Sequence, residues 1–144
     1  MIILDGKKLA NQIHQTIIPR IERLKEKNIS PTLAVVLANE TVESRTYVTM
    51  KQKTCEKLGI QCKIIRMIQP FDNNDLLQLI TDLIGATNIH TILVQLPLPE
   101  NIDKHKILSA ITPEKDVDGL NPLNFGKLFQ NNNIHFIPCT VRAC

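Results

Sequence analysis

Aromatic residues are scarce in this sequence: they make up 3% of its 144 residues, and tryptophan is absent. Apolar residues nevertheless reach 43% and charged residues 22%, which is an ordinary globular composition. The core must therefore be built from Ile, Leu and Val. A chain of this length forms one domain and can bury about two thirds of the surface that its unfolded form exposes.

Long apolar runs are missing from the start of the chain. Met1 is followed by only three aliphatic residues, Ile2 to Leu4, before Asp5 and Gly6. This run is far shorter than a signal-peptide core or the roughly 20 apolar residues of a membrane span. We therefore expect a cytoplasmic protein without a membrane partner.

Paired cysteines and a basic surface stripe are also missing. The four cysteines form no Cys-x-x-Cys pair and have no histidine at zinc-finger spacing. We therefore expect free, mostly buried thiols and neither a disulfide nor a metal site. The net charge of +3 comes from scattered lysines and arginines, which argues against nucleic acid and is compatible with an anionic small molecule.

A glycine-rich phosphate loop is missing as well, since none of the five glycines lies in a G-x-G-x-x-G pattern. This excludes the short-chain dehydrogenases, although Tyr47 and Lys51 have the Tyr-x-x-x-Lys spacing of that class.

Asp116 and Asp118 could begin a calcium loop, but its twelfth position is Lys127 where a bidentate Glu is required. Calcium binding is therefore excluded too.

The residues that are present predict alternating strands and helices. Leucines and isoleucines recur at helical spacing from Leu9 to Leu24, with a kink or split expected at Pro19. We expect a strand or an arm at 2–4 and strands at 33–37, 63–68 and 89–94. We expect helices from Ser44 as N-cap to Leu58, at 74–84 and at 103–110. This order predicts a single α/β domain of three layers, with a parallel or mostly parallel sheet and helices on both faces. Ligands of such sheets bind at the carboxyl ends of the strands.

Four segments together indicate a family. They are Ser-Arg-Thr-Tyr-Val-Thr-Met-Lys at 44–51, Val-Gln-Leu-Pro-Leu-Pro at 94–99, Lys-Asp-Val-Asp-Gly-Leu-Asn-Pro at 115–122 and Pro-Cys-Thr at 138–140. In this order and spacing the chain closely resembles the bifunctional methylenetetrahydrofolate dehydrogenase/methenyltetrahydrofolate cyclohydrolases. The resemblance covers essentially the whole chain but only about half of a usual family member.

The resemblance implies roles for five residues. Lys51 corresponds to the catalytic lysine, Gln95 to the glutamine that contacts it, and Tyr47 to a tyrosine that assists it and lines the folate ring. Asp118 corresponds to the aspartate that binds the pterin, and Pro97 joins Gln95 among the substrate-binding residues. These residue types suit the chemistry, because a lysine in a partly desolvated cleft can exchange protons near neutral pH and a carboxylate can accept two N–H bonds from the pterin.

The family reaction oxidises 5,10-methylenetetrahydrofolate with NADP or NAD and then hydrolyses the 5,10-methenyl product to 10-formyltetrahydrofolate. The resemblance assigns residues 1–137 to the folate-binding catalytic domain and 138–144 to the start of the crossing to a dinucleotide-binding domain that is absent. We therefore expect no affinity for NADP, and a monomer although the family forms homodimers. An alternative stays open: a truncated remnant that folds, and binds folate, without catalysis.

Overall fold

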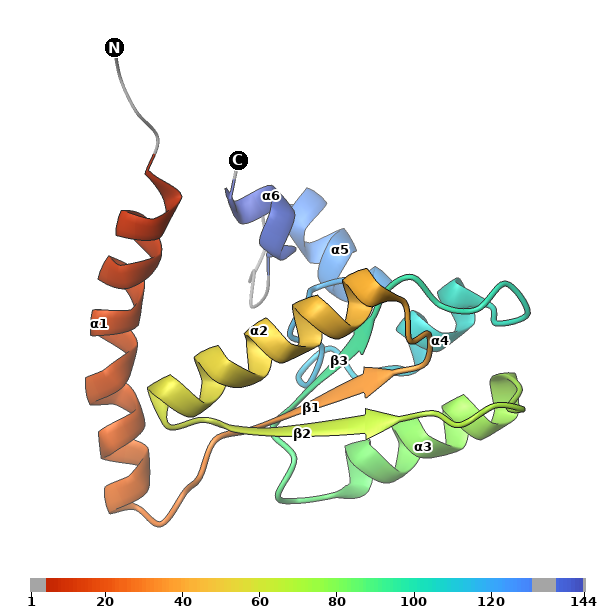
Figure 1. The fold of residues 1–144 in the computed structure, drawn as a ribbon, viewed down its shortest axis with the longest axis horizontal. Coiled ribbons are helices and arrows are strands. Elements are labelled where there is room, and N and C mark those ends of the chain that lie inside the picture. Colours follow the sequence, from red (N-terminus) through yellow and green to blue (C-terminus); the bar gives the residue numbers. More distant parts are fainter. Residues whose placement is uncertain (1–4, 131–136, 144) are drawn as a thin grey trace.

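The computed structural model describes residues 5–130 and 137–143. Its centre is a parallel sheet of three strands, β1 (Thr32–Leu37), β2 (Gln61–Arg66) and β3 (Thr91–Gln95), in the order β2-β1-β3. The central strand β1 pairs with both neighbours, Thr32 lying opposite Gln61 and Leu33 opposite Thr91. All three strands point the same way, so their carboxyl ends lie at one edge of the sheet (Figure 1).

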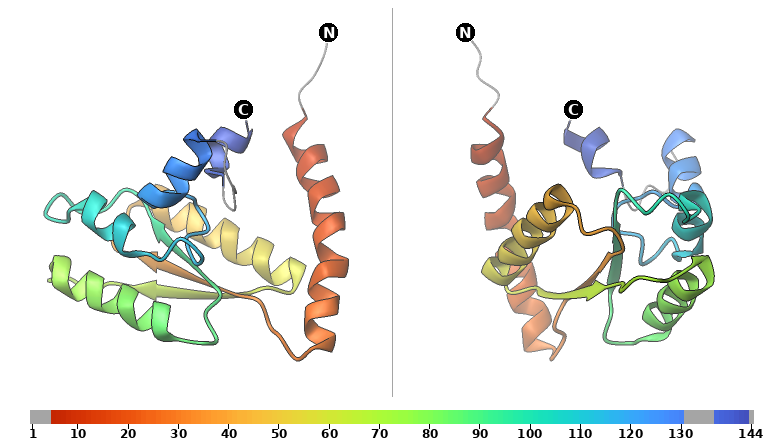
Figure 2. Two further views of the ribbon diagram at one scale, coloured as in Figure 1. Left: turned by 180° about the vertical axis from the view of Figure 1, so that it is seen from behind. Right: turned by 45° about the vertical axis from the view of Figure 1, so that its right-hand side comes forward.

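Helices cover both faces of the sheet, which confirms the predicted three-layer α/β fold. Helix α2 lies on one face, and α3 and α4 lie on the other (Figures 1 and 2). Helix α1 stands along one side of the molecule and contacts α2. The helices are α1 (Gly6–Glu26), α2 (Val42–Leu58), α3 (Asn73–Gly85), α4 (Lys104–Ala110), α5 (Pro122–Phe129) and α6 (Cys139–Ala143).

Strand β1 divides the core into two apolar clusters. Ala34 and Val36 pack into the cluster that α3 and α4 complete, whereas Val35 and Leu37 pack against Val48 of α2. Successive side chains of a strand point to opposite faces, so an unbroken aliphatic run fills both clusters at once. This is the environment that the run at 33–37 predicts.

Helix α2 carries Lys51, and its ends are fixed by specific caps. The side chain of Thr41 accepts a hydrogen bond of 3.1 Å from the backbone N–H of Ser44, so Thr41 is the N-cap and the prediction of Ser44 at that position is wrong. Thr41 is the correct cap because the N–H groups of the first turn need an acceptor outside the helix. At the other end Gly59 has a φ of 79°, the left-handed conformation expected of a glycine cap.

Other predicted boundaries need correction. Helix α1 continues through Pro19, so the split, one of the two predicted outcomes, is wrong, and the kink stays a prediction. Pro19 and Gln15 are exposed, and water can bond the carbonyl that loses its partner. Strand β2 begins two residues before the predicted strand, at Gln61. Helices α5 and α6 were not predicted at all. The strand or arm predicted at 2–4 lies outside the described residues.

The cysteines within the described residues are free, and the prediction that they are mostly buried is wrong. Cys55 and Cys62 are half-buried, and Cys139 is exposed. Burial raises the pKa of the Cys55 thiol to about 11, and the neighbouring Cys62 adds to that effect. Within residues 5–130 and 137–143, no helix has the length and apolar character needed to cross a membrane.

The cap of α2 provides a test of how the Lys51 helix is held. We expect Thr41→Ala to lower the free energy of unfolding by about 1 kcal/mol, because the Ser44 N–H loses its acceptor. Thr46→Ala is the matched control, since it removes the same atoms from the exposed middle of α2 and should cost nothing or stabilise slightly. Urea denaturation measures both, and equal losses for the two variants would contradict the assigned cap.

Candidate active site

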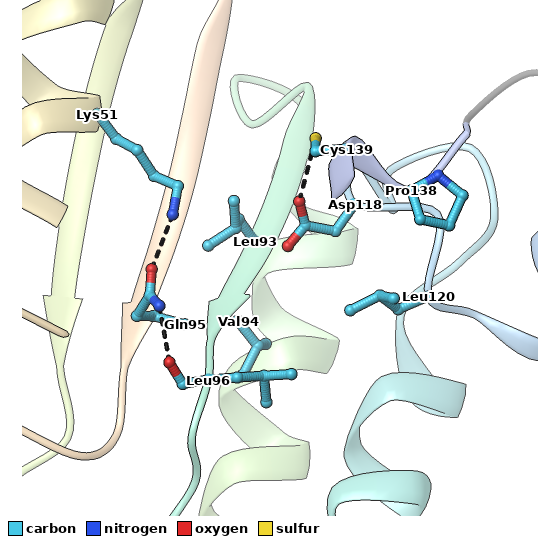
Figure 3. Close-up of a pocket in the computed structure, with 9 residues that line it drawn as sticks. All are labelled: Lys51, Leu93, Val94, Gln95, Leu96, Asp118, Leu120, Pro138 and Cys139. Atoms are coloured by element: carbon cyan, nitrogen blue, oxygen red, sulfur yellow. Dashed lines mark hydrogen bonds between the residues drawn. The ribbon is translucent and has the colours of Figure 1, made fainter. Parts of the chain in front are cut away.

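A cavity of about 290 Å³ lies at the carboxyl end of β3 (Figure 3). Its walls come from four parts of the chain: α2, the end of β3, the loop before α5, and the start of α6. The lining residues are Lys51, Leu93, Val94, Gln95, Leu96, Asp118, Leu120, Pro138 and Cys139. Of the sequence-predicted site residues, Lys51, Gln95 and Asp118 are therefore brought together at the predicted edge of the sheet.

Lys51 and Gln95 are joined by a hydrogen bond. The Lys51 Nζ donates to Gln95 Oε1 at 2.8 Å, and the Gln95 Nε2 donates to the carbonyl of Leu96 at 2.7 Å. The second bond fixes the orientation of the amide, so that its oxygen faces Lys51 (Figure 3). Gln95 is only 8% exposed, and alternation along β3 puts it on the same face as Leu93, which packs in the cluster of α2.

Tyr47 lies one turn before Lys51 on α2. The Lys51 Nζ is 5.9 Å from the centre of the Tyr47 ring, a cation–π distance. Tyr47 is 58% exposed, and Pro97, which follows Leu96 through a cis peptide bond, is also exposed. The lining of the cavity includes neither Tyr47 nor Pro97. Their roles in catalysis and substrate binding stay predictions.

Asp118 lies on the other side of the cavity from Lys51 (Figure 3). Burial raises the pKa of its carboxyl group above the ordinary value, against the opposing effects of the Lys51 charge and of a hydrogen bond from Cys139. The Cys139 Sγ donates that bond to Asp118 Oδ1 at 3.7 Å. Although Cys139 as a whole is exposed, partial burial of its sulfur raises the pKa of the thiol, and the negative charge of Asp118 adds to the effect. The Asp118 carboxyl group and the Lys51 amino group thus face one small, partly apolar space.

Sequence reasoning missed several cavity residues. Cys139 and Pro138 belong to the segment at 138–140 that was assigned to a crossing, not to a wall of the site. Leu93 and Leu120 had no chemical signal, although the rule that ligands bind at the carboxyl ends of parallel strands could have singled out Leu93. No group of three or more His, Cys, Asp or Glu side chains suited to a metal is found in the part of the chain that the structure describes.

The raised pKa of Asp118 predicts how stability depends on pH. The pKa of Asp118 is higher in the folded than in the unfolded state, so its ionisation lowers the free energy of unfolding. This loss of stability develops as pH rises from the unfolded-state pKa to the folded-state pKa. We therefore expect Asp118→Asn to be more stable than the wild type at pH 7, with the difference shrinking toward zero as pH falls below about 4. Thermal denaturation from pH 3 to 8 measures it. Glu114→Gln, at an exposed carboxylate, is the control, and a pH-independent difference for Asp118→Asn would contradict the assignment.

The chain matches known proteins over the whole of this region. A sequence model of the tetrahydrofolate dehydrogenase/cyclohydrolase catalytic domain matches residues 4–118. The bifunctional protein FolD of Moorella thermoacetica is 44% identical over 142 residues, which are 99% of this chain and 50% of that protein. FolD of Rickettsia rickettsii is 45% identical over 143 residues, again 50% of the protein. The chain thus spans about half the length of the curated relatives it matches.

Solved structures agree with this match. The crystal structure of the bifunctional methylenetetrahydrofolate dehydrogenase/cyclohydrolase FolD from Campylobacter jejuni superposes with a TM-score of 0.94 at 41% identity, covering 97% of this chain and 50% of that one. The Trypanosoma brucei enzyme, which was solved with an NADP cofactor and an inhibitor, gives 0.91 at 31% identity over 98% of this chain and 48% of its own. With the family model, the curated relatives and the solved structures in agreement, the chain belongs to the tetrahydrofolate dehydrogenase/cyclohydrolase family.

Proposed function

We propose that the chain binds a tetrahydrofolate derivative in the cavity at the end of β3 and that Lys51 is the acid–base group for hydrolysis of the 5,10-methenyl form. The observation that carries the proposal is the 2.8 Å hydrogen bond that holds Lys51 Nζ on Gln95 Oε1 at the wall of this cavity. The names of the relatives support the substrate class, since they are methylenetetrahydrofolate dehydrogenases and cyclohydrolases.

The geometry of Lys51 suits proton transfer. Hydrolysis adds water to the methenyl carbon and releases one proton as the ring opens to the 10-formyl product. The neutral amine of Lys51, beside that carbon, can assist the attack by taking the proton from water. Gln95 can serve as a positioning residue, because its amide oxygen accepts from Lys51 while its N–H is held by the Leu96 carbonyl. Tyr47 is proposed to assist from the outer side of Lys51, where its ring already lies.

Asp118 is proposed as the anchor of the pterin. Its half-buried carboxylate faces the cavity and can accept two N–H bonds from the guanidine-like edge of the ring. Such charge-assisted pairs are stronger in a partly dry site than in water. Gln95 and Pro97 are proposed to complete the binding surface, Pro97 at the outer rim because it is exposed.

Within the described residues, the cavity lining contains no glycine that could form the phosphate-binding turn of a nicotinamide dinucleotide. The pyrophosphate of such a cofactor is bound by a glycine-rich turn at a helix N-terminus, and none of the five glycines lies in that pattern. The Trypanosoma brucei relative was solved with NADP and the Saccharomyces cerevisiae relative is NAD-dependent, but this sequence lacks the glycine pattern that binds the pyrophosphate of such cofactors. We therefore propose the hydrolytic step, which needs no nicotinamide, and derive no hydride transfer for this chain.

Three further expectations stay proposals. We propose a cytoplasmic location, which suits free thiols such as Cys55 and Cys62. We propose a monomer and the division into residues 1–137 and 138–144. Pro138 and Cys139 nevertheless line the cavity, so the folate-binding site extends past that boundary.

The catalytic part of the proposal predicts that the purified chain hydrolyses 5,10-methenyltetrahydrofolate without NADP. We expect Lys51→Met to lower the rate at least about a hundredfold, because a general base of this kind contributes that much. Lys53→Met is the matched control, since Lys53 is exposed on the same helix, and it should keep the wild-type rate. Loss of the absorbance of the methenyl form measures turnover. Full activity in Lys51→Met would disprove the role of Lys51, and binding without turnover in the wild type would support the remnant alternative.

The anchoring part of the proposal predicts that 5-formyltetrahydrofolate, a stable folate, protects the chain against heat. At a hundredfold excess over Kd the protection is about 2.7 kcal/mol. Asp118→Ala should weaken binding by about 2 kcal/mol and remove most of this protection, whereas Lys51→Met should retain it. Glu114→Ala controls for the loss of an exposed carboxylate. Equal protection of wild type and Asp118→Ala would show that Asp118 is not the anchor.

A further inference from the structure

Two residues before Asp118 lies a second carboxylate, Asp116, which faces away from solvent. It is only 2% exposed, and its Oδ2 accepts two hydrogen bonds: one of 2.8 Å from the backbone N–H of Asn121 and one of 3.0 Å from Asn124 Nδ2. A carboxylate with so little exposure is costly unless it is bonded in this way. Asp116 is not among the residues that line the cavity, so its place in the fold needs another explanation.

The two asparagines extend this network to both neighbouring helices. Asn121 caps α5 by accepting from the N–H of Leu123 at 2.8 Å, and its Nδ2 donates to the carbonyl of Ile111 just after α4, also at 2.8 Å. Asn124, which is 2% exposed, donates to the carbonyl of Pro113 at 2.9 Å as well as to Asp116. Asp116 Oδ2 and the two asparagines bonded to it thus connect the end of α4, the loop at 112–121 and the first turn of α5.

On its other side the same loop is fixed to the sheet. The backbone N–H of Ile92 donates to the Lys115 carbonyl at 2.7 Å, and Ile92 and Asp116 form a parallel bridge beside β3. The Lys115 Nζ binds three carbonyls at the end of α3, those of Leu83, Ile84 and Ala86. After Asp116 the chain turns through Gly119, whose φ is 67° and whose N–H donates to the Asp116 carbonyl at 3.3 Å. Asp118 lies inside this closed turn.

We propose that Asp116 is a positioning residue of the folate site: its buried carboxylate, held by Asn121 and Asn124, fixes the one loop shape in which Asp118 faces the cavity. The ligand-binding part of this inference rests on the proposed function, but the positioning part does not. The charge of Asp116 also contributes to the raised pKa of Asp118, after the larger effect of burial. The positioning of the loop and the effect of the Asp116 charge on the pKa of Asp118 both require the two residues to stay close together.

Substitutions separate this role from general stability. Asp116→Ala removes the acceptor of both bonds. In Asp116→Asn a single amide oxygen can replace Oδ2 and keep both, so this variant tests rescue. Asn124→Ala disturbs the network from α5, at a residue that does not line the cavity, and carries the test if Asp116→Ala fails to fold. Ile80→Val, a core change in α3, is the control for lost stability.

Cys139 provides a measurement that needs no folate. Its thiol donates to Asp118, whose charge raises the pKa of the thiol, so a displaced Asp118 should speed alkylation of Cys139 by iodoacetamide. The rate is read by mass spectrometry of the Cys139 peptide at a temperature where every variant is folded, with Asp118→Asn giving the rate without that charge. Calorimetric titration with 5-formyltetrahydrofolate gives the affinity of the same proteins.

We expect Asp116→Ala and Asn124→Ala to bind 5-formyltetrahydrofolate about tenfold more weakly and to be alkylated faster, toward the rate of Asp118→Asn. Asp116→Asn should stay within about twofold of the wild type in affinity, and Ile80→Val should lower the melting temperature without changing either measurement. The inference would be overturned if both alanine variants kept the wild-type affinity and alkylation rate. It would also be overturned if Ile80→Val changed these two quantities as much as the alanine variants do. If the wild type binds no folate, the proposed function fails, and the alkylation rates alone decide the positioning role.

Discussion

Alternation of side chains along a sheet covered on both faces is the constraint on which the site depends. Each side chain of β3 packs either in the cluster of α3 and α4 or in the cluster of α2, because helices cover both faces of the sheet. Leu93 packs on the α2 side, so Gln95 must also lie there, at the point where the strand ends. A shift of one residue in register would move Gln95 to the other face and separate it from Lys51.

The two sides of the cavity are held by different kinds of contact. Lys51 is placed by a capped helix of 17 residues and by one hydrogen bond to a strand. Asp118 is placed by a loop, and this loop is held by buried hydrogen bonds to Asp116 and by the three carbonyls that Lys115 binds. A regular helix needs little extra support, whereas a loop next to a ligand needs many fixed contacts to keep one shape.

Much of this could be predicted from the sequence, since hydrophobic runs and repeated spacings report local structure. The run at 33–37 and the glycine at 59 gave the strand and helix end correctly. Helix α5 was missed although Asn121 followed by Pro122 is a readable start signal, because the segment was interpreted only as a folate motif. The buried state of Asp116 could not be predicted, since charged residues are usually exposed and its partners lie on another element.

The order of the strands has a consequence for how the chain folds during synthesis. Strand β1 is made early, but its partners come later: Thr32 pairs with Gln61, and Leu33 must wait for Thr91. Until then β1 is unpaired along one edge, and the face that α3 and α4 cover still lacks α4. Such non-local pairing slows folding and leaves an intermediate that can aggregate. The free edge of β1 is therefore open to non-native strand pairing until β3 has been synthesised.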